Sequence, residues 1–219
     1  MSKNIIITID GPAGSGKTSL AKLLAKKYSL FHLRGGTYFR TLTYAILESS
    51  IDPFNEEEVV SFAKKIKITI DLHNNYNIIF NKKNITSLLH SEKINSLVVH
   101  ISNYKDIRKL RKKWILNISL NKNLIVDGRT FGSEIFPNAT IKFYLTANLK
   151  KRAYRRIVDY NSMYTFDEIY KSLKLRDDID KASYFNKLEI PQDAYYIDNS
   201  NLSLTETLNL FSKRIDNLL

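Results

Sequence analysis

The stretch GPAGSGKT, residues 11–18, decides the fold class of this 219-residue chain. Its spacing of glycines and lysine is that of the P-loop, in which backbone N–H groups hold phosphate oxygens at the start of a helix. The flanking sequence agrees with this interpretation. The apolar run at residues 4–9 predicts a buried strand, and residues 19–30 have the apolar spacing of a helix. The motif therefore predicts an α/β fold that binds a nucleotide.

Individual residues of the motif have roles in phosphate chemistry. Lys17 is expected to reach the β- and γ-phosphates of ATP, and the Thr18 hydroxyl to ligate Mg²⁺. Asp127 ends an apolar run, where a strand-end carboxylate can hold the metal through water. An aspartate there is also a common turn residue, but the P-loop favours the metal role. The loop residues predicted to contact ATP are Gly11, Pro12, Ala13, Gly14, Ser15, Gly16, Lys17, Thr18 and Ser19.

Short strand-like runs alternate with longer helical patterns along the rest of the chain. This order predicts a mostly parallel sheet flanked by helices, as in the P-loop NTPase fold. Besides residues 4–9, the strand-like runs are 123–128, 141–146 and 194–199.

One segment differs in character from this frame. Residues 66–86 alternate β-branched residues with Asn-rich turns, which predicts small antiparallel hairpins. We expect an inserted subdomain on the substrate side, from about residue 52 to 103, within one domain. Capping boxes, Thr165 with Glu168 and Ser203 with Glu206, predict the starts of two later helices.

The composition excludes several classes of protein. A content of 43% hydrophobic and 11% aromatic residues is that of a soluble globular chain, and no apolar run approaches the length of a membrane span. The N-terminus lacks the features of a signal peptide, so we expect a cytoplasmic protein. Because there is no cysteine, disulfides, thiolate zinc sites and a cysteine nucleophile are excluded.

The formal net charge of +12 leaves two interpretations open. It suits a polyanionic partner, but it also suits a coding sequence with biased base composition, rich in Lys, Asn and Ile. The basic run at residues 105–114 supports an alternative, a P-loop protein that has lost turnover and binds nucleic acid. Against this, Ile107, Leu110 and Trp114 recur at helical spacing, which predicts an amphipathic helix with a solvated basic face. A nucleic-acid partner is therefore not expected.

The arginines indicate the type of reaction. Transfer of a γ-phosphoryl group builds charge on oxygens, which positioned guanidiniums stabilise, and an ionised phosphate acceptor needs no general base. No histidine or carboxylate stands out as a base, and no guanine-reading NKxD motif follows the P-loop. These features favour a small-molecule kinase. The arginines near the strand ends are Arg40, Arg108, Arg129, Arg152, Arg155, Arg156 and Arg176.

Nearly end to end, the chain resembles the bacterial cytidylate kinase family. The similar stretches begin with the P-loop region and LRGGTYFR, and VDGRTFGSEIFPNATIKFYLTA resembles the family's DGRDxGTxVFPxAxxKxFLxA. They continue with KKRAYRRI, KLRDDID and PQDAYYIDNSNLSLTE. The DGR followed by G and FP is far more specific than the P-loop.

The resemblance implies a nucleoside monophosphate kinase that converts ATP and CMP or dCMP into ADP and the diphosphate, with Mg²⁺, and is commonly monomeric. It implies a core (1–51, 104–150 and 183–219), the acceptor-binding insert and a lid at about 150–182. Lys17, Arg129 and Arg176 would act on the transferred group, and the lid arginines Arg152, Arg155 and Arg156 on ATP. The implied acceptor-binding residues are Gly36, Arg40, Arg108, Arg129, Thr130, Arg176 and Asp180.

The chain departs from the family pattern mainly on the acceptor side. Polar partners that could read the base are replaced, and a site that loses such partners loses discrimination. A kinase of the same fold with a different nucleotide or small-molecule acceptor is therefore the second hypothesis. The departures are Arg34, Gly35, Phe39, Val99, Thr130 and Ser183.

Overall fold

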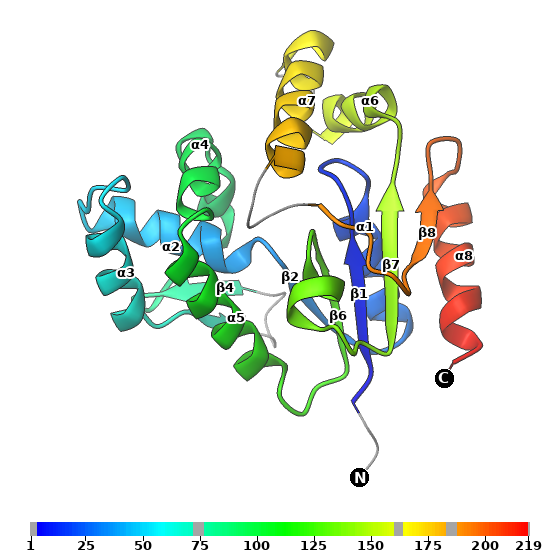
Figure 1. Ribbon diagram of the computed structural model, residues 1–219, viewed down its shortest axis with the longest axis horizontal. Helices are drawn as coiled ribbons and strands as arrows, with labels where there is room; N and C mark the ends of the chain where they lie inside the picture. Colours follow the sequence, from blue (N-terminus) through cyan, green and yellow to red (C-terminus); the bar gives the residue numbers. More distant parts are fainter. Residues whose placement is uncertain (1–3, 72–76, 160–163, 183–187, 219) are drawn as a thin grey trace. The chain divides into compact units, whose positions relative to one another are not determined.

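The computed structural model describes residues 4–71, 77–159, 164–182 and 188–218, which fall into two compact units (Figure 1). The first unit comprises Met1–Gly35 and Ser119–Leu219, and the second comprises Gly36–Ile118. Ser183, one of the departures from the family pattern, lies outside the described residues.

The first unit is built on a five-stranded sheet in the order β2-β6-β1-β7-β8, and every neighbouring pair is parallel. This confirms the predicted α/β fold with a parallel sheet. The edge strand β2 was not predicted, because only one of its four residues is fully buried. The strands are β1 (Ile6–Asp10), β2 (Phe31–Arg34), β6 (Leu124–Gly128), β7 (Ile141–Thr146) and β8 (Tyr195–Asp198).

Helices α1 (Lys17–Lys27) and α8 (Leu204–Asp216) pack together over one face of this sheet. Their apolar side chains join those of β1 and β7 in one buried cluster, in which Phe211 stacks on Phe143 with 4.0 Å between ring centroids. The capping box predicted at Ser203 is present and begins α8. The core thus fixes the strand that precedes the P-loop and the helix that follows it.

Helices α6 (Leu149–Asp159) and α7 (Phe166–Ala182) of the same unit lie in the segment predicted to be the lid. They pack against each other and against the P-loop through Ala13, Ala153, Ile169 and Leu173. The capping box of Thr165 and Glu168 is also confirmed, because each residue's backbone N–H donates to the other's side chain. A five-residue turn of π-helix, Phe131–Ile135, follows β6.

The second unit is mostly helical and has its own core. Its three-stranded sheet, in the order β3-β4-β5, is antiparallel and confirms the predicted hairpins. The predicted basic, amphipathic helix is α5, whose Ile107 is buried while Lys105 and Lys109 are exposed. The elements are α2 (Thr37–Glu48), α3 (Glu56–Lys65), β3 (Thr69–Asp71), β4 (Asn77–Phe80), β5 (Lys83–Asn84), the 3₁₀ turn Thr86–His90, α4 (Glu92–Ile101) and α5 (Lys105–Ser119).

In the part of the chain that the structure describes, no helix has both the length and the apolar character needed to cross a membrane.

Candidate active site

The P-loop turns sharply between β1 and α1 through three glycines with positive φ. Gly11 has φ 146°, and a Cβ there would lie 2.0 Å from the carbonyl oxygen of Leu145 in the adjacent strand, so only glycine fits. Gly16, with φ 94°, is the N-cap of α1, and no side chain among the described residues caps this helix end. The first N–H groups of α1 are thus available to an anion, as phosphate binding by a P-loop requires.

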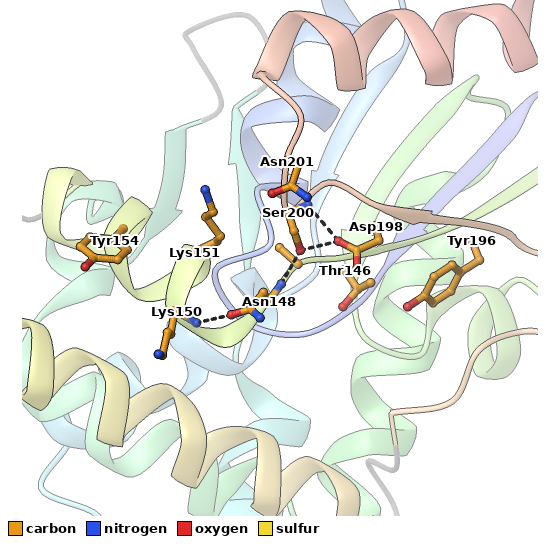
Figure 2. Close-up of a pocket in the computed structure, with 10 residues that line it drawn as sticks. Thr146, Asn148, Lys150, Lys151, Tyr154, Tyr196, Asp198, Ser200 and Asn201 are labelled. Atoms are coloured by element: carbon orange, nitrogen blue, oxygen red, sulfur yellow. Dashed lines mark hydrogen bonds between the residues drawn. The ribbon is translucent and has the colours of Figure 1, made fainter.

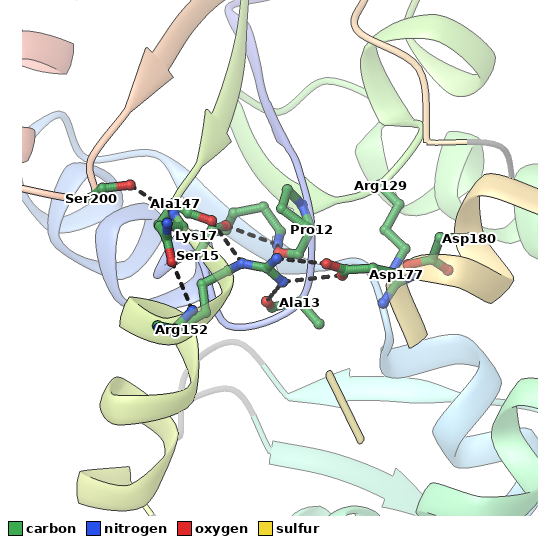
Figure 3. Close-up of polar contacts among 12 residues, drawn as sticks. Pro12, Ala13, Ser15, Lys17, Arg129, Ala147, Arg152, Asp177, Asp180 and Ser200 are labelled. Atoms are coloured by element: carbon green, nitrogen blue, oxygen red, sulfur yellow. Dashed lines mark hydrogen bonds and ion pairs between the residues drawn. The ribbon is translucent and has the colours of Figure 1, made fainter. Parts of the chain in front are cut away.

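Arg152 of α6 holds the outer side of the P-loop (Figure 3). Its Nη1 donates to the Ala13 carbonyl at 3.0 Å and its Nε to the Ala147 carbonyl at 2.8 Å. Its two terminal nitrogens donate to the two oxygens of Asp177 in α7, at 3.1 and 2.6 Å. Through these bonds Arg152 joins the P-loop, the end of β7 and the helices α6 and α7, and so positions the P-loop in this structure.

Arg155 makes a second connection, through Asn199 after β8. Its guanidinium donates to the Asn199 side-chain oxygen at 2.9 Å and to its backbone carbonyl at 2.7 Å. The Asn199 amide in turn donates to the Ser15 carbonyl at 3.2 Å. Arg156 lies partly buried on the same helix. Contacts of these three arginines with ATP remain predictions.

Positive charge is concentrated beside the loop. The Lys17 ammonium donates to the Pro12 carbonyl at 2.6 Å, and burial together with the charge of Arg129 lowers its pKa to about 7. Burial and the nearby Arg176 likewise lower the pKa of Arg129 to about 9, so this guanidinium keeps its proton at neutral pH. Arg129 forms an ion pair with Asp180 of α7 (Figure 3). Lys17, Arg129 and Arg176 thus disfavour one another's charge, and an anion beside them would favour the charged form of each.

The predicted metal ligands lie in contact with each other. The Thr18 hydroxyl donates to Oδ2 of Asp127 at 2.6 Å, and Nε2 of His32 lies 2.7 Å from Oδ1. Burial alone would raise the pKa of Asp127, but the hydrogen bonds and charges of His32, Thr18 and Lys17 outweigh it and lower that pKa. The described residues contain no cluster of three or more His, Cys, Asp or Glu that could bind a metal unaided. The hydroxyl and the ionised carboxylate therefore suit Mg²⁺ that takes its other ligands from phosphates and water.

The end of β6 and the turn after it carry the DGR motif and one departure from the family pattern, Thr130. Asp10, at the end of β1, accepts hydrogen bonds from the backbone N–H groups of Phe131 and Gly132 at 2.9 and 2.7 Å. Thr130 is buried, and its hydroxyl donates to the Glu134 carboxylate at 2.9 Å. A carboxylate therefore lies against Thr130, although the family's acid at that position is missing.

Gly35 lies against this same turn rather than in open space. Its N–H donates to the Asp127 carbonyl at 2.9 Å. A Cβ on Gly35 would lie 2.4 Å from that carbonyl oxygen and 2.4 Å from the Phe131 ring. The missing hydroxyl at position 35 is thus explained by packing, since Phe131 fills the space. The neighbouring departure, Arg34, ends β2 and pairs in register with Asp127.

The remaining predicted acceptor residues belong to the second unit. Gly36 is the N-cap of α2, and Arg40 donates from Nη1 to the Leu89 carbonyl and the Asn95 side chain at 2.8 and 2.7 Å. Arg108 is buried, with Nη1 3.4 Å from the Ser102 carbonyl. The departures Phe39 and Val99 pack in the apolar core of this unit. The roles of Gly36, Arg40 and Arg108 in binding an acceptor remain predictions.

A pocket of about 620 Å³ opens at the carboxyl ends of β7 and β8 (Figure 2). Asn148 and Ser200 line it, and the Asn148 N–H donates to the Ser200 hydroxyl at 2.7 Å. The ring of Tyr196, at the pocket edge, stacks on Tyr144 with centroids 5.8 Å apart. Lys150, Lys151 and Tyr154 of α6 line the opposite wall. The sequence patterns did not indicate this pocket.

Several residues that organise the site were also not identified from sequence. Most of them could not be identified from sequence, because their roles depend on which strand ends lie side by side. The exception is Asp10, an acid at the end of the strand before the P-loop, since parallel strands bring such residues to the same edge of a sheet. These residues are Asp10, His32, Glu134, Asp177 and Asn199.

Known proteins resemble this chain in sequence and in structure. A sequence model described as Cytidylate kinase matches residues 7–217. A cytidylate kinase of Fusobacterium nucleatum is 35% identical over 97% of this chain and 98% of its own length. A cytidylate kinase of Alkaliphilus oremlandii is 34% identical over 97% of this chain and 96% of its own length.

Two solved structures share the fold at low sequence identity. An uncharacterized protein from Eubacterium ventriosum has a TM-score of 0.53 at 15% identity, covering 98% of this chain and 99% of that one. Shikimate kinase from Bacteroides thetaiotaomicron has a TM-score of 0.50 at 11% identity, covering 97% and 98%.

The packing at Gly35 predicts unequal effects at the two adjacent glycines. Gly35→Ser should lower the free energy of unfolding by about 1–3 kcal/mol, because its Cβ meets the Asp127 carbonyl and the Phe131 ring. Gly36→Ser is the matched control, since a Cβ there meets only the Arg40 side chain, at 3.7 Å. Urea unfolding followed by circular dichroism measures both. Equal stability of the two variants would contradict the packing explanation.

Proposed function

The chain belongs to the cytidylate kinase family, and from this we propose that it transfers the γ-phosphoryl group of ATP to CMP or dCMP, giving ADP and CDP or dCDP. The observation that carries the proposal is the P-loop, where the start of α1 has no side-chain cap among the described residues and lies beside the basic side chains of Lys17, Arg129 and Arg176. Family membership supplies the nucleotide substrates, and the geometry assigns tasks to residues. A monomeric state and a cytoplasmic location remain predictions.

The chemistry needs charge stabilisation more than proton transfer. A phosphate oxygen of the acceptor bonds to the γ-phosphorus as the bond from that phosphorus to the β–γ bridging oxygen breaks, and ADP leaves with the electron pair. The attacking oxygen is already ionised, so no base is required. Lys17, Arg129 and Arg176 stabilise negative charge on the group in transfer, and the N-terminus of α1 holds the donor's phosphates.

Mg²⁺ would be held by Thr18 and by Asp127, directly or through water. When bound, it neutralises phosphate charge and orients the donor. Its presence in the working enzyme is a proposal that the paired hydroxyl and carboxylate support.

We assign the adenosine of ATP to the pocket at the ends of β7 and β8. Asp198 and Ser200 line the pocket, and Asn199 between them is tied to the P-loop by the bonds that join Arg155, Asn199 and Ser15. An adenosine in this pocket would be connected to the phosphates that the P-loop holds. The exposed tyrosine and the lysine stems on α6 supply apolar surface for the base.

For acceptor selection, Glu134 is the replacement for the acid that the family carries at position 130. Cytosine differs from uracil by an amino donor at C4, and a carboxylate only accepts hydrogen bonds. The Glu134 carboxylate lies against Thr130, and the preceding residue, Arg129, is proposed to bind the acceptor together with its ion-pair partner Asp180. Glu134 is thus able to favour CMP over UMP. The second hypothesis, a different acceptor, is tested by the same measurement.

Turnover tests the proposed function directly. Steady-state release of ADP with CMP, dCMP, UMP, AMP and non-nucleotide acceptors should show the highest kcat/KM for CMP or dCMP. Lys17→Ala should lower kcat by about a thousandfold or more, because it removes the ammonium group that stabilises negative charge on the transferred phosphoryl group. Lys22→Ala, an exposed change on the same helix, is the control and should keep wild-type turnover. Near-normal kcat in Lys17→Ala would contradict its role.

The assignment of Glu134 makes a separate prediction about base choice. Glu134→Gln should lower kcat/KM for CMP about tenfold and leave or raise that for UMP, because the amide can donate to the uracil carbonyl. The kcat/KM ratio of CMP to UMP is the measurement, with the KM for ATP as an internal control that should not change. An unchanged ratio would show that another group reads the base.

A further inference from the structure

Three residues from three different elements form a hydrogen-bonded chain below the P-loop: His32 of β2, Asp127 of β6 and Thr18 of α1. We propose that His32 is a positioning residue, which fixes the Asp127 carboxylate so that one chosen oxygen faces Thr18 and the metal. The inference rests on the proposed function only in that a P-loop kinase uses Mg²⁺. The catalytic and nucleotide-binding roles above assign nothing to His32.

The hydrogen-bond chemistry fixes the direction of the chain. An ionised carboxylate can only accept, so His32 donates its Nε2–H to Oδ1 and Thr18 donates its hydroxyl to Oδ2. The first contact is 2.7 Å, and the two side chains are only 11% and 9% exposed. A short bond to a charged group in a dry place is among the stronger hydrogen bonds. Oδ1 is therefore committed to His32, and Oδ2 is the oxygen on the P-loop side.

The sheet explains how a residue so far away in sequence reaches Asp127. Strands β2 and β6 are parallel neighbours, with Arg34 opposite Asp127. His32, two residues before Arg34, projects from the same face and is the diagonal neighbour of Asp127. The hydrogen bond from the Gly35 N–H to the Asp127 carbonyl holds this register at the strand end. The backbone thus delivers the imidazole to one side of the carboxylate and the P-loop helix to the other.

The consequence is control of the carboxylate's rotation. Without a donor on Oδ1, the Asp127 carboxylate can turn about its Cβ–Cγ bond and present either oxygen to Thr18. Partners that orient a ligating group typically change metal affinity by about 10–100-fold. His32 would then act on metal affinity while touching neither the metal nor the nucleotide.

Substitution of His32 tests this with a readout that is independent of turnover. Binding of Mn²⁺, a spectroscopic substitute for Mg²⁺, to the complex of the full chain with ADP is measured by electron paramagnetic resonance. His32→Phe keeps a ring but removes the donor, and should weaken Mn²⁺ binding about tenfold or more. His32→Gln, whose amide can replace the Nε2 donor, should remain within about threefold of the wild type on the same scale.

The matched control is His100→Phe, since His100 also bonds a side chain, the Tyr104 hydroxyl at 2.6 Å, but in the second unit. It should bind Mn²⁺ like the wild type. If His32→Phe does not fold, His32→Asn, whose amide is too short to reach Oδ1, serves in its place. Wild-type affinity in the folded variant lacking the donor, or an equal loss in His32→Gln, would overturn the proposal. Because Mn²⁺–ADP binding needs no acceptor, absence of CMP turnover in the wild type would instead count against the proposed function.

Discussion

The backbone of the P-loop, with positive φ at Gly11, Gly14 and Gly16, is the constraint on which the rest of the site depends. Its outward carbonyl groups need donors, which Arg152 and the amide of Asn199 supply to Ala13 and Ser15. Those donors tie α6, α7 and the end of β8 to the loop. Among the described residues no side chain caps the start of α1, which leaves its N–H groups available for the proposed phosphate site. In this structure Arg152 and Arg155 therefore help to hold the P-loop in shape.

The acceptor side is where the chain has changed most, and two of the changes have structural partners. Gly35 lacks a side chain where the ring of Phe131 occupies the space. Thr130 has no carboxylate of its own, but its hydroxyl contacts the carboxylate of Glu134. Each substitution is thus matched by a neighbour in the turn after β6. This pattern fits a site that has been repacked while keeping its chemistry, and it supports a cytosine-reading kinase over a protein that has lost its activity.

Much of the fold could be predicted because its signals are local. The spacing of GPAGSGKT, the apolar strand runs and the two capping boxes each depend on a few consecutive residues, and the structure confirms them. The strand β2 and the partners of Asp127 could not be predicted from sequence, since their roles arise only when β2 and β6 pair in register. His32 illustrates this point. In sequence it is one of four scattered histidines, and in the folded chain it lies 2.7 Å from the predicted metal ligand.

As a cytidylate kinase, this chain should pass a phosphoryl group from ATP to CMP. Phosphorus-31 NMR of a mixture of the protein, ATP, Mg²⁺ and CMP tests it most directly, because it identifies every phosphorus-containing product. CDP and ADP should appear in equal amounts while ATP and CMP decline together, with no inorganic phosphate beyond that in a mixture without enzyme. Release of inorganic phosphate with CMP unchanged, or no reaction at all, would contradict it.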